Sequence, residues 1–363
     1  MIYKNLWKIF SDQWDLGVVT HARRNYIGYI NVTYEVDILN NLVDRKQKRL
    51  ILRIYRKGTS EEKIRFEHAL LDELHARKFD LSPCLIETKN GKTFVKVNEQ
   101  LDHGPVEYYL AAFSYLQGKD KYAWNSPLCT ENELKNAAGV LAAYHHTIYG
   151  WEGIPEWRGQ RSIETFPEMI RQWNTHARNS SASFFDLYFK EELDYLLRQL
   201  QKVPDQTVYD AMPHLAVHGD YHPGNIKFLN GKVVGVFDFD WSAMDARCYD
   251  VGNAILFFCA DWNAATGGKL IRNRVDRFLE AYQKKAANLN GIGPLNTLEL
   301  EYLPEMIRVA NLHSVLDWTL DHFYNVGADP QECTDFLKQS IRVSRWLEGH
   351  RERLAARIMK HRF

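Results

Sequence analysis

The stretch that decides the fold is residues 218–240, which read HGDYHPGNIKFLNGKVVGVFDFD. Two runs inside it, 226–229 and 232–237, contain mostly β-branched, aromatic and other apolar residues, as strands do. Asn230-Gly231 joins them, and an Asn-Gly pair between two such runs is the strongest short-range signal for a tight β-hairpin. The sequence therefore predicts a hairpin at this point.

The predicted turn also predicts which side chains meet. A two-residue turn fixes the strand register, and this register sets Asn225 opposite Val236. Asp238 then becomes a diagonal neighbour of Asn225 on the same face, roughly 7–8 Å away at the backbone. Oxygen-bearing side chains at this spacing can share one magnesium ion. We therefore expect a metal site at Asn225 and Asp238, with Asp240 as a possible further ligand because it repeats the alternation.

A third acidic group stands close to this pair. Asp220 lies five residues before Asn225, in a loop that Pro223 and Gly224 keep out of helix and strand. Phosphoryl transfer needs a carboxylate that orients the attacking hydroxyl, together with oxygen ligands for ions that neutralise the phosphates. A single loop Asp is usually a turn residue, but three such groups converging on one point favour a catalytic role.

The chain before this stretch, up to about residue 113, is expected to form strands with one helix. Strands are predicted at 32–39, at 49–55, and in two runs between 85 and 97. The last two runs flank Asn90-Gly91, which predicts a second hairpin. Thr59 and Glu62 make a capping-box pattern in front of the apolar stripe of the helix, namely Ile64, Leu71 and Leu74.

From about residue 118 onward the pattern becomes helical. Thr130 and Glu133 form another capping box before the first of the expected helices, at 134–148, 184–200, 275–285, 299–324 and 331–354. The segment 151–182 contains Trp, Gly, Pro and Ser residues and is expected to be an irregular connection. The hairpin within 218–240 is expected to be alone in this helical half.

Composition excludes several classes of protein. The 363 residues hold 46 basic and 46 acidic side chains, so the basic excess typical of nucleic-acid-binding proteins is absent. The five cysteines are scattered and form no C-x-x-C pair, which argues against a disulfide framework or a cysteine zinc site. No run of eighteen apolar residues and no signal peptide is visible. We expect a cytoplasmic protein without nucleic-acid or membrane partners.

The segment HGDYHPGN followed by VFDFD resembles the catalytic and metal-binding segments of the aminoglycoside phosphotransferase and choline kinase group. Within that group it is most similar to the homoserine kinase type II and spore-coat CotS-like branch, and the resemblance reaches across most of the chain. It implies an α+β, bilobal, protein-kinase-like fold: an antiparallel sheet plus one helix, then a mostly helical lobe with a catalytic β-hairpin. The expected bounds are 1–113 for the nucleotide-binding lobe, 114–118 for the hinge and 119–363 for the helical lobe.

The resemblance also implies roles for single residues. It makes Asp220 the catalytic base and gives the metal to Asn225 and Asp238. The strand RLILRIYR resembles the family strand whose Lys contacts the phosphates, with Arg53 in place of the Lys. Arg presents a planar fork where Lys presents a compact ammonium, so the exchange is not neutral. Glu67 resembles the acid that pairs with this basic residue; the alternative is a solvated helix Glu.

Further residues come from the same comparison. Gly28, within YIGYINVTYEV, resembles the loop that covers the phosphates, and Ser114, Tyr115 and Leu116 resemble the hinge that binds adenine. Asp250 in CYDVGNAI and His218 resemble supporting residues of the catalytic loop. A histidine metal site at His214, His218 and His222 is disfavoured, because Pro and Gly interrupt the helix that it would need.

The acceptor is less well defined. Asp317 and Trp318 would suit an aminated substrate, by charge pairing and cation–π contact, if they point inward; an amphipathic packing helix explains the same residues. The expected activity is transfer of the γ-phosphoryl group of ATP, with Mg²⁺, to a hydroxyl of a homoserine-, amino-sugar- or choline-like acceptor. Two alternatives remain open: a nucleotide-binding pseudokinase, and a metallophosphoesterase, for which the upstream D-x-H element is missing.

Overall fold

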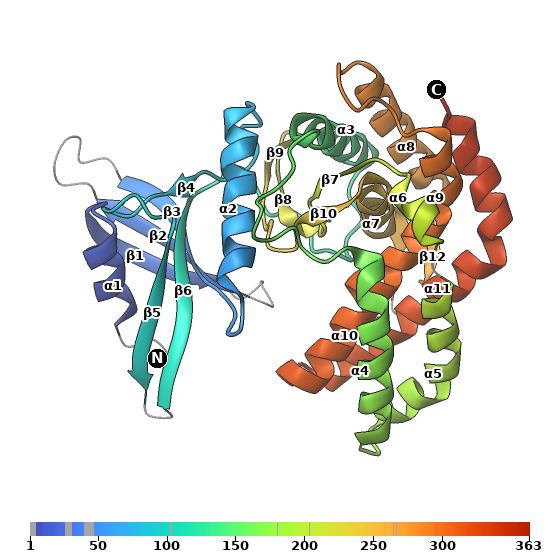
Figure 1. Cartoon of the computed structure of the whole chain (residues 1–363), viewed down its shortest axis with the longest axis horizontal. Helices are drawn as coiled ribbons and strands as arrows, with labels where there is room; N and C mark the ends of the chain where they lie inside the picture. The colour runs from blue at the N-terminus through green and yellow to red at the C-terminus, as the bar shows by residue number, and fades with distance from the viewer. Residues whose placement is uncertain are drawn as a thin grey trace. The chain divides into compact units, whose positions relative to one another are not determined.

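The computed structural model describes residues 5–25, 31–39, 47–101, 104–179, 181–202, 204–263, 265 and 267–363. The chain forms two compact units (Figure 1). One unit is Met1–Gln117 with Gly235–Phe237, and the other is Gly118–Val234 with Asp238–Phe363. The first unit is built on a β-sheet and the second is mostly helical, so the α+β expectation is confirmed.

The described residues of the first unit form one antiparallel six-stranded sheet. Its strands are β1 (Val18–Asn25), β2 (Val32–Leu39), β3 (Gln47–Ile54), β4 (Leu85–Ile86), β5 (Phe94–Leu101) and β6 (Gly104–Ser114). They lie in the order β1-β2-β3-β6-β4, and β5 also pairs with β6. The strands expected at 32–39 and 49–55 are therefore confirmed, as β2 and β3.

The hairpin expected at Asn90-Gly91 is wrong. The chain does turn there, since the N–H of Gly91 donates to the carbonyl of Thr88 at 3.0 Å. However, β4 and β5 do not pair with each other, and both pair with β6 along the same edge. The long β6 offers more pairing partners than a local hairpin does, and β5 pairs along its length with β6, from Phe94 opposite Ala111 to Leu101 opposite Gly104.

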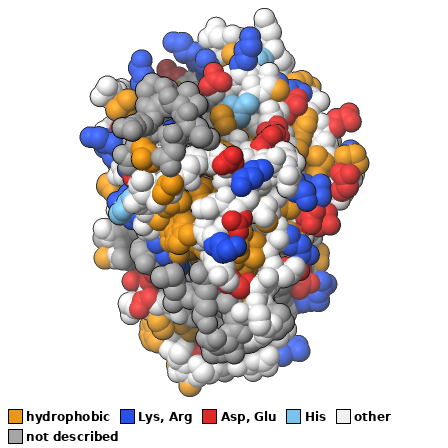
Figure 2. All heavy atoms as spheres, turned by 90° about the vertical axis from the view of Figure 1, so that its left-hand side faces the viewer, with side chains coloured by type: hydrophobic (Ala, Val, Ile, Leu, Met, Phe, Trp, Pro, Cys, Tyr) orange, Lys and Arg blue, Asp and Glu red, His pale blue; other side chains and the backbone are white. Residues whose placement is uncertain are grey.

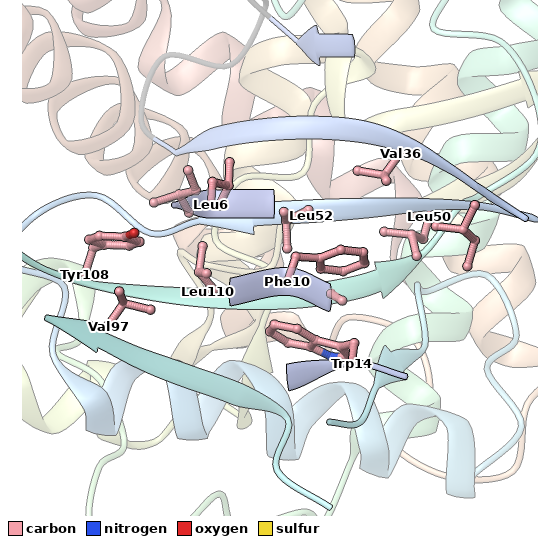
Figure 3. Packing of buried hydrophobic residues seen from close by; sticks show 12 residues of the cluster. Leu6, Phe10, Trp14, Val36, Leu50, Leu52, Val97, Tyr108 and Leu110 are labelled. Atoms are coloured by element: carbon pink, nitrogen blue, oxygen red, sulfur yellow. The ribbon is translucent and has the colours of Figure 1, made fainter. Parts of the chain in front are cut away.

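Among the residues that the structure describes, two helices cover the sheet, α1 (Leu6–Gln13) and α2 (Glu61–Ala76). Side chains alternate along β3, so Leu50, Leu52 and Ile54 join the apolar cluster of Leu6 and Phe10 from α1 and of Trp14, which directly follows that helix (Figure 3). The intervening residue Arg53 pairs with α2 on the opposite face. The sheet is thus packed between α1 and α2, and the buried Arg53–Glu67 pair lies on the α2 side.

The expectation of a single helix in this unit was incomplete, because α1 was not predicted. The helix that was predicted is α2, and its apolar stripe of Ile64, Leu71 and Leu74 is buried as expected. Its cap is shifted by one residue: Ser60, not Thr59, accepts the N–H of Lys63, at 3.3 Å. The short eight-residue α1 carries no side-chain cap, so the sequence offered no start signal for it.

The second unit contains nine α-helices among its described residues. They are α3 (Glu131–Ile148), α4 (Phe166–Asn179), α5 (Phe184–Gln201), α6 (Gln206–Asp210), α7 (Arg247–Cys259), α8 (Arg272–Ala287), α9 (Thr297–Ala310), α10 (Trp318–Asp321) and α11 (Pro330–Ile358). The capping box of Thr130 and Glu133 is present at the start of α3. The expected helices at 134–148, 184–200, 275–285 and 331–354 are confirmed.

Two expectations for this unit are corrected. The segment 151–182 is not wholly irregular, because it holds α4, which buries Phe166, Met169 and Trp173 on one face. The hairpin of β8 (Ile226–Leu229) and β9 (Lys232–Val236) is also not alone. Two further two-stranded sheets pair β7 (His214–Val217) with β10 (Ala243–Ala246), and β11 (Ala260–Asp261) with β12 (Lys269–Leu270).

The expected long helix at 299–324 is interrupted twice by π-helix. After α9, residues Asn311–Asp317 form a π-helical segment, α10 follows, and His322–Val326 are π-helical again. π-helical turns inside α-helices occur often at functional sites, because they redirect side chains that a regular helix would bury. The first π-helical segment ends at Asp317, a residue singled out above.

The surface is consistent with a neutral total charge. Figure 2 shows one face on which acidic and basic side chains are mixed around a central group of hydrophobic ones. No helix among the described residues combines the length and the apolar character that crossing a bilayer requires.

Candidate active site

The hairpin that organises the site has the predicted turn. Asn230 and Gly231 both have positive φ, 50° and 75°, as a type I′ turn requires. The alternation expected beyond it does not hold, because β9 ends at Val236 and Asp238 has a φ of 68°. Asp238 is therefore not a strand residue diagonal to Asn225, and the strand parity assumed for Asp240 is also lost. Asp is among the few residues that tolerate this left-handed conformation.

Asn225 and Asp220 are brought together. Asn225 ends the short 3-10 turn Pro223–Asn225, directly before β8. Its amide Nδ2 donates to Oδ2 of Asp220 at 2.9 Å and to the backbone carbonyl of Asp220 at 3.0 Å. Because the amide nitrogen faces Asp220, the carbonyl oxygen Oδ1 of Asn225 is the atom that a cation would use.

His222 contacts the same carboxylate. Its Nε2 lies 3.4 Å from Oδ2 of Asp220, and its Nδ1 accepts the N–H of Gly224 at 3.0 Å. Burial raises the pKa of Asp220, but the neighbouring His222 and His218 and the amide of Asn225 outweigh it and hold that pKa below its ordinary value of 3.8. The side chain of Asp220 is 23% exposed, so an ionised carboxylate remains accessible at neutral pH.

Asp250, in the first turn of α7, holds the loop of Asp220 through hydrogen bonds to the loop backbone. Its Oδ2 accepts the N–H of His218 at 2.9 Å, and its Oδ1 accepts the N–H of Gly219 at 3.0 Å. His145 of α3 lies 2.9 Å from the same Oδ2 and 2.7 Å from the hydroxyl of Tyr282. Asp250 is fully buried, so these bonds offset the cost of burying its charge and hold the loop rigid.

Gly219 fits where no other residue would. Its φ is 79°, and a Cβ atom there would lie 2.3 Å from the carbonyl oxygen of Trp241. The carbonyl of Gly219 accepts the side-chain amide of Asn253 at 2.8 Å, and the same amide donates to Oγ of Ser314 at 3.0 Å. Asn253 therefore connects the loop of Asp220 to the π-helical segment that ends at Asp317.

His218 and Asp240 lie inside the protein near this loop. Nδ1 of His218 accepts the N–H of Asp220 at 3.3 Å, and its ring packs on Phe239 with centroids 4.5 Å apart. His218 thus touches the segment that contains Asp238 through a ring contact. Asp240 is buried, in the turn that follows Phe239.

In the first unit, the expected pair of Arg53 and Glu67 is present. Nη1 of Arg53 lies 2.7 Å from Oε1 of Glu67, and both residues are buried. The hydroxyl of Tyr55 donates to Oε2 of Glu67 at 2.9 Å. Glu67 is therefore not the solvated helix residue that was its alternative reading. The contact of Arg53 with phosphates stays a prediction.

The hinge residues follow directly from β6. Ser114 is the last residue of that strand, and its N–H donates to the carbonyl of Cys84 at 2.8 Å. This N–H is consequently in use, and the adenine contacts expected for the backbone of Ser114, Tyr115 and Leu116 stay a prediction. The guanidinium of Arg49 lies over the Tyr115 ring, 5.3 Å from its centroid. Gly28 lies outside the described residues.

Asp317 and Trp318 contact different elements. Oδ1 of Asp317 accepts the indole N–H of Trp173, in α4, at 2.8 Å. The ring of Trp318 stacks on His322 with centroids 3.9 Å apart and lies 6.0 Å from Phe336, in α11. Neighbouring residues on a helix point in different directions, so one inward-facing pair does not form as envisaged.

Burial gives Asp317 an unusual charge state. It raises the pKa of Asp317 to about 6, and the nearby negative charge of Asp321 acts in the same direction, although the bond from Trp173 opposes both. Among the described residues Asp317 has no ion-pair partner. A carboxylate of this kind would gain most from a cation supplied by a ligand.

The side-chain oxygens of Asn225 and Asp238 are of the kind that magnesium binds. Within the described parts of the chain, no group of three His, Cys, Asp or Glu residues is arranged to hold a metal. Magnesium in kinases is bound by one or two protein oxygens and completes its shell with phosphate oxygens and water. Asn225 and Asp238 carry an amide oxygen and a carboxylate, which is the chemistry that such a site needs, and their role as metal ligands stays a prediction.

Sequence reasoning missed three residues of this site. His222 was considered only as a metal ligand, and neither His145 nor Asn253 was singled out. The signal for His222 was its position two residues after Asp220 and directly before Pro-Gly, where a tight turn brings the ring back. The signal for His145 was a histidine on the buried face of an amphipathic helix.

Comparison with known proteins agrees with this geometry. The model of the phosphotransferase enzyme family matches residues 21–288. A homoserine kinase of Agrobacterium fabrum is 24% identical over 354 residues, which cover 94% of this chain and 92% of the relative. Both the matched region and the alignment include the whole of the loop and hairpin described above.

Solved structures show the same fold. A microcompartment-associated aminopropanol kinase superposes with a TM-score of 0.64 at 17% identity, covering 97% of this chain and 98% of that one. A spectinomycin phosphotransferase in complex with ADP and spectinomycin superposes with a TM-score of 0.60 at 14% identity, covering 95% and 98%. The chain therefore belongs to the phosphotransferase enzyme family, as a small-molecule kinase with a two-lobed, protein-kinase-like fold.

Proposed function

We propose that this protein transfers the γ-phosphoryl group of ATP to a hydroxyl of a small, amine-bearing alcohol. The observation that supports this most strongly is the state of Asp220. Its carboxylate has a depressed pKa, is partly exposed, and is held by the side chains of Asn225 and His222. Such a group can orient a hydroxyl and take its proton late, which is what a loose transition state requires.

We assign the binding of the nucleotide to the other residues that the sequence predicted for it. In this proposal Arg53, fixed by Glu67, contacts the phosphates, and the backbone at Tyr115 and Leu116 binds adenine. Mg²⁺, held by Asn225 and Asp238, would neutralise charge on the phosphates. The structure of the spectinomycin phosphotransferase with ADP supports an adenine nucleotide as the cosubstrate.

The acceptor's amine is assigned to Asp317. The bridge from Gly219 through Asn253 to Ser314 connects the π-helical segment of Asp317 to the catalytic loop. Burial has removed much of the water around Asp317, so an ammonium group would restore its charge compensation. The relatives named above as homoserine kinase and aminopropanol kinase act on amino alcohols, which is consistent with such an acceptor.

ADP release over a panel of acceptors tests the proposal. The panel contains homoserine, 1-amino-2-propanol, ethanolamine, choline and an amino sugar, each beside a matched alcohol that lacks the amine. We expect ADP release that depends on Mg²⁺ and on an acceptor from the aminated set. Release that is equal with aminated and unaminated alcohols would contradict the role of Asp317, and ATP-independent phosphate release from monoesters would contradict the kinase reaction.

A further inference from the structure

We propose that His222 positions Asp220, by donating its Nε2–H to Oδ2 so that Oδ1 is presented to the acceptor's hydroxyl. This inference rests on the proposed function, since it concerns the same transfer. Nε2 of His222 lies 3.4 Å from Oδ2 of Asp220, slightly longer than an ordinary hydrogen bond. Catalytic hydrogen bonds are often long without substrate and shorten when the complex forms.

The direction of this bond follows from the other ring nitrogen. Nδ1 of His222 accepts the backbone N–H of Gly224 at 3.0 Å. A neutral imidazole that accepts at Nδ1 must carry its proton on Nε2, which is the nitrogen that faces Asp220. In this proposal His222 therefore directs its N–H toward the carboxylate, and the backbone N–H of Gly224 determines this tautomer.

Close packing fixes the ring in place. A Cβ atom on Gly224 would lie 2.9 Å from Cε1 of His222, so only glycine allows the ring to lie this close to the backbone at position 224. On another side the ring meets the edge of Phe257, with centroids 5.4 Å apart. The side chain of His222 is 14% exposed. These contacts leave the imidazole little freedom to turn away from Asp220.

The two oxygens of Asp220 consequently differ. Both side-chain donors, Nδ2 of Asn225 and Nε2 of His222, are directed at Oδ2. No donor within the described residues bonds Oδ1. Two donors on one oxygen determine the rotation of the carboxylate, and Oδ1 is then the atom that receives the acceptor's proton.

The transfer of the phosphoryl group leaves the protonation of His222 unchanged. The acceptor's oxygen forms a bond to the γ-phosphorus while the bond from that phosphorus to the bridging oxygen breaks, and ADP leaves with the electron pair. The hydroxyl proton moves to Oδ1 of Asp220. His222 keeps its proton throughout, because Oδ2 accepts a hydrogen bond both as part of a carboxylate and as the carbonyl oxygen of the neutral acid.

Two substitutions of His222 separate the role of its Nδ1 from the role of its Nε2. His222→Asn keeps a polar atom near the place of Nδ1, and so can still accept from Gly224, but does not reach Asp220. His222→Gln carries its amide nitrogen about as far as Nε2 and keeps the donor. We expect His222→Asn to lower kcat by about 10²-fold with a nearly unchanged KM for ATP, since small misplacements of a catalytic group cost that much. His222→Gln should retain most of kcat.

A lowered kcat in His222→Gln together with a parental kcat in His222→Asn would overturn the proposal, because His222 would then act only through its hydrogen bond with Gly224. The substitution must also act through Asp220. In an Asp220→Asn background, His222→Asn should cost less than about 3-fold, since residues that act as a unit are not additive. A full 10²-fold loss in that background would also overturn it. His350→Asn, on α11, is the control for replacing a histidine.

A measurement that needs no turnover keeps this inference separate from the proposed function. Nitrogen-15 NMR of the histidine side chains in the full chain reports which ring nitrogen carries the proton. We expect His222 to be protonated on Nε2 and its signals to move in Asp220→Asn, while those of His350 stay unchanged. A proton on Nδ1, or signals unaffected by Asp220→Asn, would overturn the proposal. Failure of every acceptor would refute the proposed function and still leave this result decisive for His222.

Discussion

Oε1 of Glu67 lies 2.7 Å from Nη1 of Arg53, on the face of the sheet that α2 covers. The other carboxylate oxygen of Glu67 accepts the hydroxyl of Tyr55 at 2.9 Å. Both charged groups are buried, so the pair holds a guanidinium in a fixed position in the first unit. Its geometry does not require Lys at position 53, because the fork of Arg reaches the same carboxylate.

Glu67→Gln should therefore destabilise the protein strongly. The substitution removes the charge that compensates Arg53, and breaking a buried ion pair on one side costs about 3–5 kcal/mol. Urea denaturation of the full chain measures the effect. Glu61→Gln is the control, because Glu61 forms an exposed pair with Arg65 in the same helix, and such pairs contribute less than about 1 kcal/mol. Equal stability of the two variants would contradict the account.

Stability should fall as the pH drops below neutral. Burial, helped by the charge of Arg53, lowers the pKa of His68 to about 3, and burial also lowers the pKa of His145 despite Asp250. The folded protein keeps these rings neutral, whereas the unfolded chain takes up protons near pH 6.5. Each ring then removes up to about 1.4 kcal/mol per pH unit below that value.

Denaturation between pH 7.5 and 4.5 measures this slope. His68→Gln should give a shallower slope than the parent protein, since one of the two rings no longer titrates. A parent protein that gains stability between pH 7 and 5 would contradict the assignment of neutral buried histidines.

Acceptor binding should depend on the charge of Asp317. With its pKa raised to about 6, the carboxylate is mostly protonated at pH 5 and mostly ionised at pH 7. An ammonium group needs the ionised form, so the KM for an aminated acceptor should fall about 10-fold from pH 5 to 7. Asp317→Asn should raise that KM and flatten its pH dependence, while the KM for ATP stays unchanged. A pH-dependent KM that persists in Asp317→Asn would exclude this residue.

Gly219→Ala should lower kcat as well as stability. A methyl group there would lie 2.3 Å from the carbonyl oxygen of Trp241, at a φ of 79°. Gly150 has the same φ of 79°, and nothing lies within 4 Å of the site of its Cβ. Gly150→Ala should consequently cost only about 1 kcal/mol, from the backbone conformation, and leave kcat intact. Equal kcat values for the two variants would contradict this prediction, because the loop of Asp220 would then tolerate a methyl group at position 219.

Local signals in the sequence predicted much of the fold. The turn at Asn230-Gly231 and the capping box at Thr130 depend only on a few neighbouring residues, and both are present. The hairpin at Asn90-Gly91 was wrong because strand pairing depends on the whole sheet, in which β6 serves as partner to both β4 and β5. The residues of α4 show an apolar spacing that the surrounding Gly and Pro residues obscured.

The site was predictable as a set of residues, but its contacts were not. Asp220 and Asn225 are close in sequence and were expected together, as the hydrogen bond between them bears out. The path to Asp238 was misjudged, since a single positive φ ends the alternation of a strand. The contact of His145 with Asp250 joins two helices 105 residues apart in sequence, and no local pattern specifies it.

The most direct test of the central claim is the turnover of Asp220→Asn. ADP release and ³¹P NMR of the product are followed with Mg·ATP and the best acceptor, beside Asp194→Asn, which changes an exposed acid on α5. We expect the parent and Asp194→Asn to form one phosphomonoester per ADP, and Asp220→Asn to be slower by about 10²–10⁴-fold while remaining folded. A folded Asp220→Asn that turns over at the parental rate would contradict the assignment of Asp220 as the catalytic base.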